Sequence, residues 1–419
     1  MLRPCRTNWP TRSRSSATRT RSAVSFARHL SSGRVDPSDI RLVSAKPAIM
    51  PVSQIMQDLA GNVALDELFA KYEPSHAGYK QLKASLDKIL NAEDKVAERP
   101  FIPGGPILEK GMRDERVPML RTRLALNVAS DAPPIMDAAL VEALRAFQED
   151  NGLRATGKLN KYTVQVLNHQ TKVKRPVDLS DIAANMERWR WLPRDLGDLH
   201  VIVNIPEFLV RVEKGGKTTY EGRVVVGKEN SPTPIFSDNI EYVVVNPSWN
   251  VPPSIVRNEM IPMLQNNPEE FFRRGYEVTQ DRRGNYKFRQ PPSARNALGR
   301  VKFIFPNNHD VYLHDTPAKG YFSRSYRAFS HGCVRVDNPL KFADALLVQE
   351  PKISSKRIQR LYGGSEQFLH LEKDIPVHLV YFTAFADAAG TVERRADVYG
   401  IDSRLKTLLG FNKRTARNG

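Results

Sequence analysis

The spacing of hydrophobic residues changes near residue 195. Before this point, apolar residues recur at intervals of three and four, which predicts helices that bury one face. After it, short β-branched runs alternate with turn residues such as Gly215-Gly216, which predicts strands. The sequence therefore predicts an α+β protein with a helical first half and a β-rich second half.

The helical half divides at the Pro and Gly cluster of residues 100–106, which indicates a linker or domain entry. Residues 46–115 are predicted to be a helical scaffold segment, and residues 116–170 a three-helix domain that ends its second helix at Gly152. The scaffold stripes contain Leu65, Leu68 and Phe69, then Tyr79, Leu82, Leu86, Ile89 and Leu90. Those of the domain contain Leu120, Leu124 and Leu126, then Leu140, Leu144 and Phe147, then Tyr162, Val166 and Leu167.

The β-rich domain is predicted over residues 195–385, followed by a C-terminal tail, 386–419. Its predicted strands are Leu199–Asn204, Phe208–Val212, Arg223–Val226, Ile240–Asn246, Val301–Phe305, Asp310–His314 and Val377–Phe382. An insertion of about residues 250–299 separates the fourth strand from the fifth, and it is predicted to contain two short helices. Asn267-Pro268 suits a helix start and Gly275 a helix end.

Composition adds limits to this picture. No apolar run approaches the ~20 residues that cross a bilayer, so no transmembrane helix is expected. The net charge is +17, but eight arginines lie in the first 34 residues, which leaves about +9 for the remainder. We find no nucleic-acid-binding motif, and a positive surface suits other polyanions, such as cell-wall polymers, equally well.

Residues 1–45 are predicted to be a leader, and their type stays open. The first 34 residues are rich in Arg and Ser and lack acidic residues, as in an organellar transit peptide, but no apolar stretch is long enough for a secretory signal. An extended gene start or an export segment are the alternatives. The two cysteines, Cys5 and Cys333, are poor material for a disulfide, since one lies in this leader.

The candidate catalytic residues lie in the string Ser330-His331-Gly332-Cys333-Val334-Arg335 and at His314, which lies 19 residues before the cysteine. A thiol is a good nucleophile only as thiolate, and a neighbouring imidazole can take its proton. His314 ends a predicted strand, a rigid platform from which it can act as the base toward Cys333. Backbone N–H groups around Gly332 and Cys333 can stabilise the negative oxygen of a tetrahedral intermediate.

His314 with the Ser-His-Gly-Cys-Val-Arg string resembles the active-site motif of the L,D-transpeptidases. The string Trp249-Asn250-Val251-Pro252-Pro253 and the insertion resemble the larger Gram-negative subgroup, which has a capping subdomain. Residues 141–153, with Gly157 and Thr163, resemble the peptidoglycan-binding domain found beside wall enzymes; a generic helical bundle is the alternative. The resemblance implies a β-rich catalytic domain with a helical capping insertion, preceded by a small three-helix peptidoglycan-binding domain.

The resemblance also implies site roles. Cys333 is the nucleophile, His314 the base, and the carbonyl of Asp315 orients the base. Catalytic residues are thus Cys333, His314, His331 and Gly332, with His331 in a supporting role. Substrate-facing or site-ordering residues are Tyr312, Ser330, Arg335 and Trp249. Tyr312 is equally consistent with packing, Arg335 with a structural ion pair, and Trp249 fits a core or hinge position better than a substrate contact.

The predicted function is that of a periplasmic peptidoglycan L,D-transpeptidase in wall construction. Cys333 would attack the bond between the third-residue diamino acid and the D-Ala of a tetrapeptide stem, and pass the acyl group to an amine of another stem. Hydrolysis by a carboxypeptidase or cysteine peptidase, and tethering of outer-membrane proteins, are alternatives, as is a noncatalytic wall-binding protein. The family further implies acylation by carbapenems. No cofactor, no nucleic acid and no metal is implied, since paired zinc-ligand spacing is missing.

Overall fold

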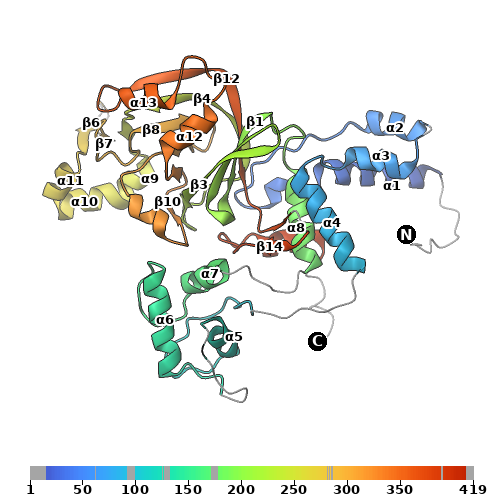
Figure 1. Cartoon of the computed structure of the whole chain (residues 1–419), viewed down its shortest axis with the longest axis horizontal. Coiled ribbons are helices and arrows are strands. Elements are labelled where there is room, and N and C mark those ends of the chain that lie inside the picture. The colour runs from blue at the N-terminus through green and yellow to red at the C-terminus, as the bar shows by residue number, and fades with distance from the viewer. Residues whose placement is uncertain are drawn as a thin grey trace.

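The computed structural model describes residues 16–61, 63–91, 100–124, 126, 133–170, 178–280, 282, 284, 286–387 and 390–411. It shows a curved sheet at the centre, with the scaffold helices on one side, the capping insertion on the other and the three-helix domain below (Figure 1). Cys5 lies outside the described residues. Among those described, no helix has the length and apolar character needed to cross a bilayer.

The scaffold contains α1 (Ser16–Ser32), a 3₁₀ helix (Pro37–Asp39), α2 (Val52–Ala60), α3 (Leu65–Tyr72) and α4 (Ala77–Asn91). Ala27 of α1 is buried with Leu68 and Tyr72 of α3, so part of the segment predicted as a leader packs into the fold. The predicted helices at 65 and 79 are present, but Leu65 and Leu90 are exposed, because each lies at a helix end beyond the buried stripe.

The three-helix domain consists of α5 (Arg116–Arg123), α6 (Ala138–Asp150) and α7 (Lys161–Gln170) around a core of its own. Gly152 has φ +64, the left-handed conformation expected of a residue that ends a helix. Two predicted core positions are wrong: Tyr162 is exposed, and Val166 packs into the core of the β-rich domain instead. This contact and the ion pair of Lys161 with Glu229 (2.6 Å) join the two domains.

The β-rich domain has one nine-stranded sheet with the order β10-β3-β11-β9-β8-β4-β12-β1-β2, and β2 also pairs with β3 and closes it. The strands are β1 (Leu199–Asn204), β2 (Leu209–Lys214), β3 (Lys217–Gly227), β4 (Phe236–Val245), β8 (Val301–Ile304), β9 (Leu313–His314), β10 (Ala328–Ser330), β11 (Val334–Val336) and β12 (Gln367–Val380). Valines from most of them fill the interior, as expected of a closed sheet with one apolar face.

Helices pack against this core. They are α8 (Leu179–Arg190), α12 (Pro339–Leu346), α13 (Ser355–Arg360) and α14 (Asp402–Leu409), with 3₁₀ helices at Ile205–Glu207 and Lys319–Ser323. A hairpin of β13 (Ala384–Ala386) and β14 (Val392–Arg394) precedes α14. The predicted C-terminal tail therefore includes folded elements, and Leu405 of α14 is fully buried in the main core.

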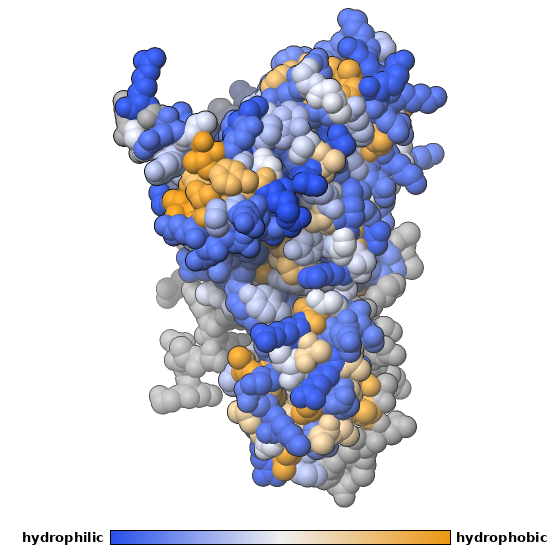
Figure 2. Space-filling model, turned by 90° about the vertical axis from the view of Figure 1, so that its left-hand side faces the viewer, coloured by the Kyte–Doolittle hydropathy of each residue, from blue (hydrophilic) through white to orange (hydrophobic). Residues whose placement is uncertain are grey.

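The capping insertion contains α9 (Pro253–Ile255), a π-helix (Val256–Met260), α10 (Ile261–Asn266) and α11 (Pro268–Arg273). Asn267 caps α11 by accepting from the N–H of Glu270, and Gly275 has φ +79, as predicted. The prediction of helices alone was incomplete, since β5 (Trp249–Asn250), β7 (Tyr286–Gln290) and β6 (Glu277–Gln280) form a second sheet. The insertion has a separate hydrophobic core. Figure 2 shows the side of the molecule on which the insertion and the three-helix domain are both visible, with small groups of hydrophobic residues at its surface.

Candidate active site

The sheet places five predicted or newly found polar side chains on one face. Register pairs Lys302 of β8 with His314 of β9, and His314 with Arg335 of β11. Side chains two residues apart in an extended chain share a face, so Tyr312 joins His314 and Cys333 joins Arg335 there. The sheet thus brings together the thiol, the imidazole and two cationic side chains.

His314 is oriented by the backbone. Its ring is 4% exposed, and Nδ1 lies 2.5 Å from the carbonyl oxygen of Asp315. A carbonyl only accepts, so Nδ1 carries the proton and the lone pair of the neutral ring lies on Nε2. Burial, and then the charge of Arg335, lower the pKa of His314 to about 3. The imidazole is therefore neutral and able to accept a proton at neutral pH.

Cys333 is a half-buried free thiol whose Sγ lies 3.6 Å from the carbonyl oxygen of Asp310. Burial raises its pKa to about 11, although hydrogen bonding from Tyr312 and the charges of Arg335 and Lys302 act in the opposite direction. Because the thiol is protonated and His314 is neutral, a preformed thiolate–imidazolium pair is disfavoured. Proton transfer then has to accompany nucleophilic attack.

The loop between β10 and β11 is held by its own side chain. Ser330 is buried, and its hydroxyl accepts from the N–H of Gly332 (3.2 Å) and donates to the carbonyl of Cys333 (2.6 Å). Gly332 has φ +118, a conformation that L side chains rarely adopt. The N–H of Gly332 is thus occupied, whereas that of Cys333 has no partner among the described residues.

Sequence reasoning missed Thr233, which contacts this loop, and Tyr399, which contacts Thr233. The hydroxyl of Thr233 donates to the carbonyl of Gly332 at 2.7 Å, and the N–H of Thr233 donates to the hydroxyl of Tyr399 at 3.1 Å. Thr233 lies 99 positions from Gly332 and 166 positions from Tyr399, and no motif surrounds either residue. Only the fold brings them together.

Arg335 and Lys302 make no ion pair with a carboxylate in the part of the chain that the structure describes. The guanidinium of Arg335 lies over the ring of Tyr321, 5.8 Å from its centroid, and its Nε is buried without a hydrogen-bond partner. The ammonium of Lys302 lies 5.1 Å from the ring centroid of Tyr312. Burial lowers the pKa of both cations, which is the expected sign for charges that lack a counter-ion.

His331 points away from this group and toward the capping insertion. Its Nε2 lies 2.5 Å from Oε1 of Glu259, in the π-helix, and 3.0 Å from Nζ of Lys228. One nitrogen cannot donate to Glu259 and accept from Lys228 at once, and the shorter contact favours the proton on Nε2. Lys228 then interacts mainly with the carboxylate of Glu259, at 3.7 Å.

Trp249 belongs to the capping insertion. Its ring packs against the core of that insertion, 6.3 Å from the ring centroid of Tyr276. This packing is the alternative noted for Trp249, and a substrate contact by this residue stays a prediction. No cluster of three or more metal-ligating side chains occurs among the described residues.

Comparison with protein families matches three regions of the chain. Residues 198–353 match the L,D-transpeptidase catalytic domain. The resemblance predicted from the sequence is confirmed. Residues 113–167 match the family described as "Putative peptidoglycan binding domain", and residues 17–86 match the Scaffold domain. The L,D-transpeptidase-like domain contains all of the residues assembled around Cys333, whereas Tyr399 lies beyond its matched range.

A curated relative from Haemophilus influenzae, described as "Putative L,D-transpeptidase", is 31% identical over 243 residues. The match covers 54% of this chain and spans 48% of that protein's length. Among solved structures, the L,D-transpeptidase from Mycobacterium smegmatis is 14% identical, with 43% of this chain and 58% of that chain covered and a TM-score of 0.24. L,D-transpeptidase 3 from Mycobacterium tuberculosis is 10% identical, with 43% and 60% covered and a TM-score of 0.24.

Proposed function

We propose that the protein is a peptidoglycan L,D-transpeptidase of the periplasm. The observation that supports this most is the shared face of the sheet, on which the thiol of Cys333 and the oriented imidazole of His314 lie beside two cations that have no counter-ion among the described residues. The family match of residues 198–353 and the peptidoglycan-binding-like domain support the same substrate. That domain is joined to the catalytic region by Lys161 and Val166, which would keep bound glycan near the site.

The first half of the reaction forms a thioester. The sulfur of Cys333 attacks the carbonyl carbon of the third-residue diamino acid, while Nε2 of His314 takes the thiol proton. The tetrahedral intermediate then collapses, the bond to the D-Ala nitrogen breaks, and the imidazolium returns the proton to that leaving amine. Free D-Ala departs and the acyl group stays on Cys333.

The second half transfers the acyl group. An amine attacks the thioester carbonyl and gives a proton to His314, after which the carbon–sulfur bond breaks and Cys333 recovers its proton. With the side-chain amine of another stem as acceptor, the product is a 3→3 cross-link. A lysine of an outer-membrane protein would instead give a tether, and water would give hydrolysis.

The unpaired groups of the site suit the charges of this reaction. The N–H of Cys333 is available for the oxyanion of both tetrahedral intermediates. Arg335 and Lys302 are available for the terminal carboxylate of the donor, which belongs to the D-Ala next to the bond that breaks. Tyr312 contacts both Lys302 and Cys333, and would therefore order the lysine side chain and the thiol.

The deciding experiment incubates the full chain with a disaccharide-tetrapeptide and analyses the products by mass spectrometry. We expect a dimer that lacks one D-Ala, its loss by at least about 10⁴-fold in Cys333→Ala, and unchanged circular dichroism of that variant. A donor with a C-terminal amide in place of the carboxylate should react at least about 10-fold more slowly, as expected for a lost charge-assisted contact. Free tripeptide as the sole product would support the carboxypeptidase alternative, and dimer formation by Cys333→Ala would disprove the assignment of the nucleophile.

A further inference from the structure

The peptide unit that precedes Cys333 is anchored on one side. The carbonyl oxygen of Gly332 accepts from the hydroxyl of Thr233 at 2.7 Å. In a trans peptide the C=O and the N–H point in opposite directions, so this hydrogen bond also fixes the direction of the Cys333 N–H. That N–H points away from Thr233 and has no partner among the described residues.

Thr233 is itself fixed from two sides. It is fully buried, and its hydroxyl accepts from the N–H of Gly227 at 2.9 Å while donating to Gly332. Its backbone N–H donates to the hydroxyl of Tyr399 at 3.1 Å. The same Tyr399 hydroxyl donates to the carbonyl of Gly227 at 2.8 Å. Tyr399 therefore joins the two ends of the loop 227–233 with one oxygen atom.

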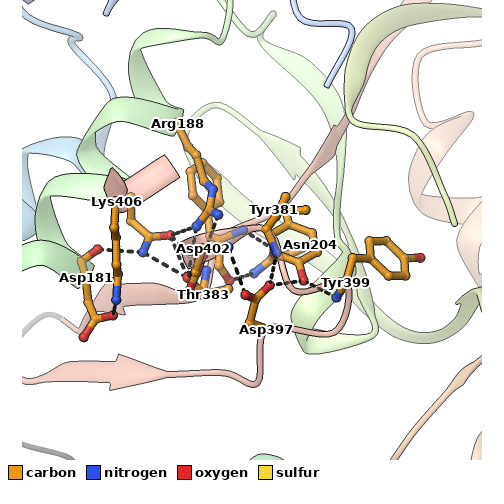
Figure 3. Close-up of polar contacts among 12 residues, drawn as sticks. Asp181, Arg188, Asn204, Tyr381, Thr383, Asp397, Tyr399, Asp402 and Lys406 are labelled. Atoms are coloured by element: carbon orange, nitrogen blue, oxygen red, sulfur yellow. Dashed lines mark hydrogen bonds and ion pairs between the residues drawn. The ribbon is translucent and has the colours of Figure 1, made fainter. Parts of the chain in front are cut away.

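Tyr399 is held in turn by a polar network below the sheet (Figure 3). Its backbone N–H donates to the hydroxyl of Tyr381 at 2.6 Å, and Tyr381 donates to Oδ1 of Asp397 at 2.7 Å. The carboxylate of Asp397 also accepts from the backbone N–H groups of Ile401 (3.0 Å) and Asp402 (2.9 Å). The network thus ties the start of α14 to the segment that presents Tyr399.

The far end of this network is an ion pair. Asp402 accepts from the guanidinium of Arg188 in α8 at 2.5 Å; Arg188 is buried and Asp402 is partly buried. Arg188 also donates to the hydroxyl of Thr383, at 3.0 Å. Figure 3 shows Arg188, Asp402 and Asp397 in the middle of the cluster, between Lys406 on one side and Tyr399 on the other, whose ring points away from it. An uninterrupted series of hydrogen bonds thus runs from Asp397 through Tyr381, Tyr399 and Thr233 to Gly332.

We propose that Thr233 and Tyr399 are positioning residues that aim the Cys333 N–H at the oxyanion of the acyl-transfer reaction. The proposal rests on the function proposed above, and it adds two residues that belong to no sequence motif. A donor stabilises an oxyanion only at a suitable distance and angle, so a peptide free to rotate would lose much of that effect. The hydroxyl of Thr233 removes this freedom, and Tyr399 holds Thr233.

The test compares conservative variants that differ by one hydroxyl group. Thr233→Val keeps the shape of the side chain but removes the donor to Gly332, and we expect kcat for acyl transfer to fall about 10- to 100-fold, with KM within about threefold of the wild type. Thr233→Ser keeps the hydroxyl and should retain activity within about threefold. Tyr399→Phe acts through Thr233 and should lower kcat by about 10-fold. Thr219→Val is the matched control, because its hydroxyl donates to the carbonyl of Val212 in the same sheet, away from the loop.

A second reaction separates positioning from general damage. Alkylation of Cys333 by iodoacetamide needs the thiol but develops no oxyanion, and we expect its rate in Thr233→Val and Tyr399→Phe to match that of the wild type when Cys5→Ala is present throughout. Equal losses of alkylation and acyl transfer would mean that the variants disturb the whole site, and would overturn the proposal. So would full acyl-transfer activity in both variants. If Thr233→Val fails to fold, Tyr399→Phe decides the outcome alone. A wild-type protein that alkylates normally but forms no thioester with the donor stem would instead overturn the proposed function, and this inference with it.

Discussion

The loop that carries Cys333 and the capping insertion meet at His331, but different forces hold them in place. The loop is fixed by hydrogen bonds of buried groups, from Ser330 inside it and from Thr233 behind it. The insertion has its own core and reaches the loop through Glu259, whose contacts with His331 and Lys228 are partly exposed. Exposed ion pairs contribute about 0–1 kcal/mol, whereas leaving a buried polar group unpaired costs about 1–3 kcal/mol.

This difference separates two tasks of the proposed enzyme. The atoms that react are held rigidly by the closed sheet, as acyl transfer requires. The contact of the insertion with the loop through Glu259 can open at small cost, which would suit the proposed enzyme, since it must admit two large stem peptides in turn. Contact with Glu259 fits the supporting role predicted for His331, since its ring faces the insertion.

The largest effect is expected when the predicted base, His314, is removed from the rigid part of the site. His314→Ala should lower the rate of acyl transfer by about 10²- to 10⁴-fold, because no other described imidazole shares the face of the sheet with Cys333. His309→Ala is the control, as this exposed histidine lies in the preceding turn. Single-turnover rates measure the effect. A rate within threefold of the wild type would show that another group takes the thiol proton.

The second prediction concerns the protonation states of Cys333 and His314. A pKa of about 11 for Cys333, rather than 9.0, lowers the thiolate fraction near neutral pH about 100-fold. In a Cys5→Ala background, iodoacetamide should therefore modify Cys333 slowly at pH 7, with a rate that rises up to about pH 11. His314, with its pKa lowered to about 3, stays neutral above that pH, so acyl transfer should show no acid limb near pH 6.5. A fast alkylation plateau at pH 7 would indicate a thiolate–imidazolium pair instead.

The smallest effect is expected on the weakly held side. Glu259→Gln removes the charge that faces Lys228 and His331, and should raise the ratio of hydrolysis to transfer by about two- to fivefold, the range of a contact worth up to about 1 kcal/mol. Glu269→Gln, an exposed position in the same insertion, is the matched control. Product ratios from the disaccharide-tetrapeptide assay give the answer. A fall in the rate of acyl transfer above 100-fold would mean that Glu259 takes part in catalysis, and that the insertion is as important to the reaction as the loop.

Sequence reasoning succeeded where one local pattern decides the structure. The run Leu199–Asn204 is apolar and β-branched, and it forms β1 over those residues. The strand predicted from Asp310 to His314 is shorter, since Asp310 has φ +53 and turns the chain, so that β9 begins at Leu313. Helix ends at Asn267 and Gly275 were predictable because capping depends on neighbouring residues alone.

The supports of the site could not be predicted in this way. The strands β10 and β11 are three residues each, too short for an alternating pattern to show. Thr233, Tyr399 and Lys302 are ordinary residues in the sequence, and their roles follow from strand register and from contacts over long separations. The motif named the reacting groups, but the pairing of the sheet determined what surrounds them.

Gly227, at the end of β3, limits which amino-acid substitutions this protein can accept during evolution. A methyl group at this position would lie 2.2 Å from the carbonyl oxygen of Ser231 and 2.6 Å from the nitrogen of Thr233, so any side chain would push the loop 227–233 outward. That loop carries Lys228 toward the insertion and Thr233 toward Gly332. Mutational tolerance should therefore be low at Gly227, since one substitution there would loosen the cap and the oxyanion donor together.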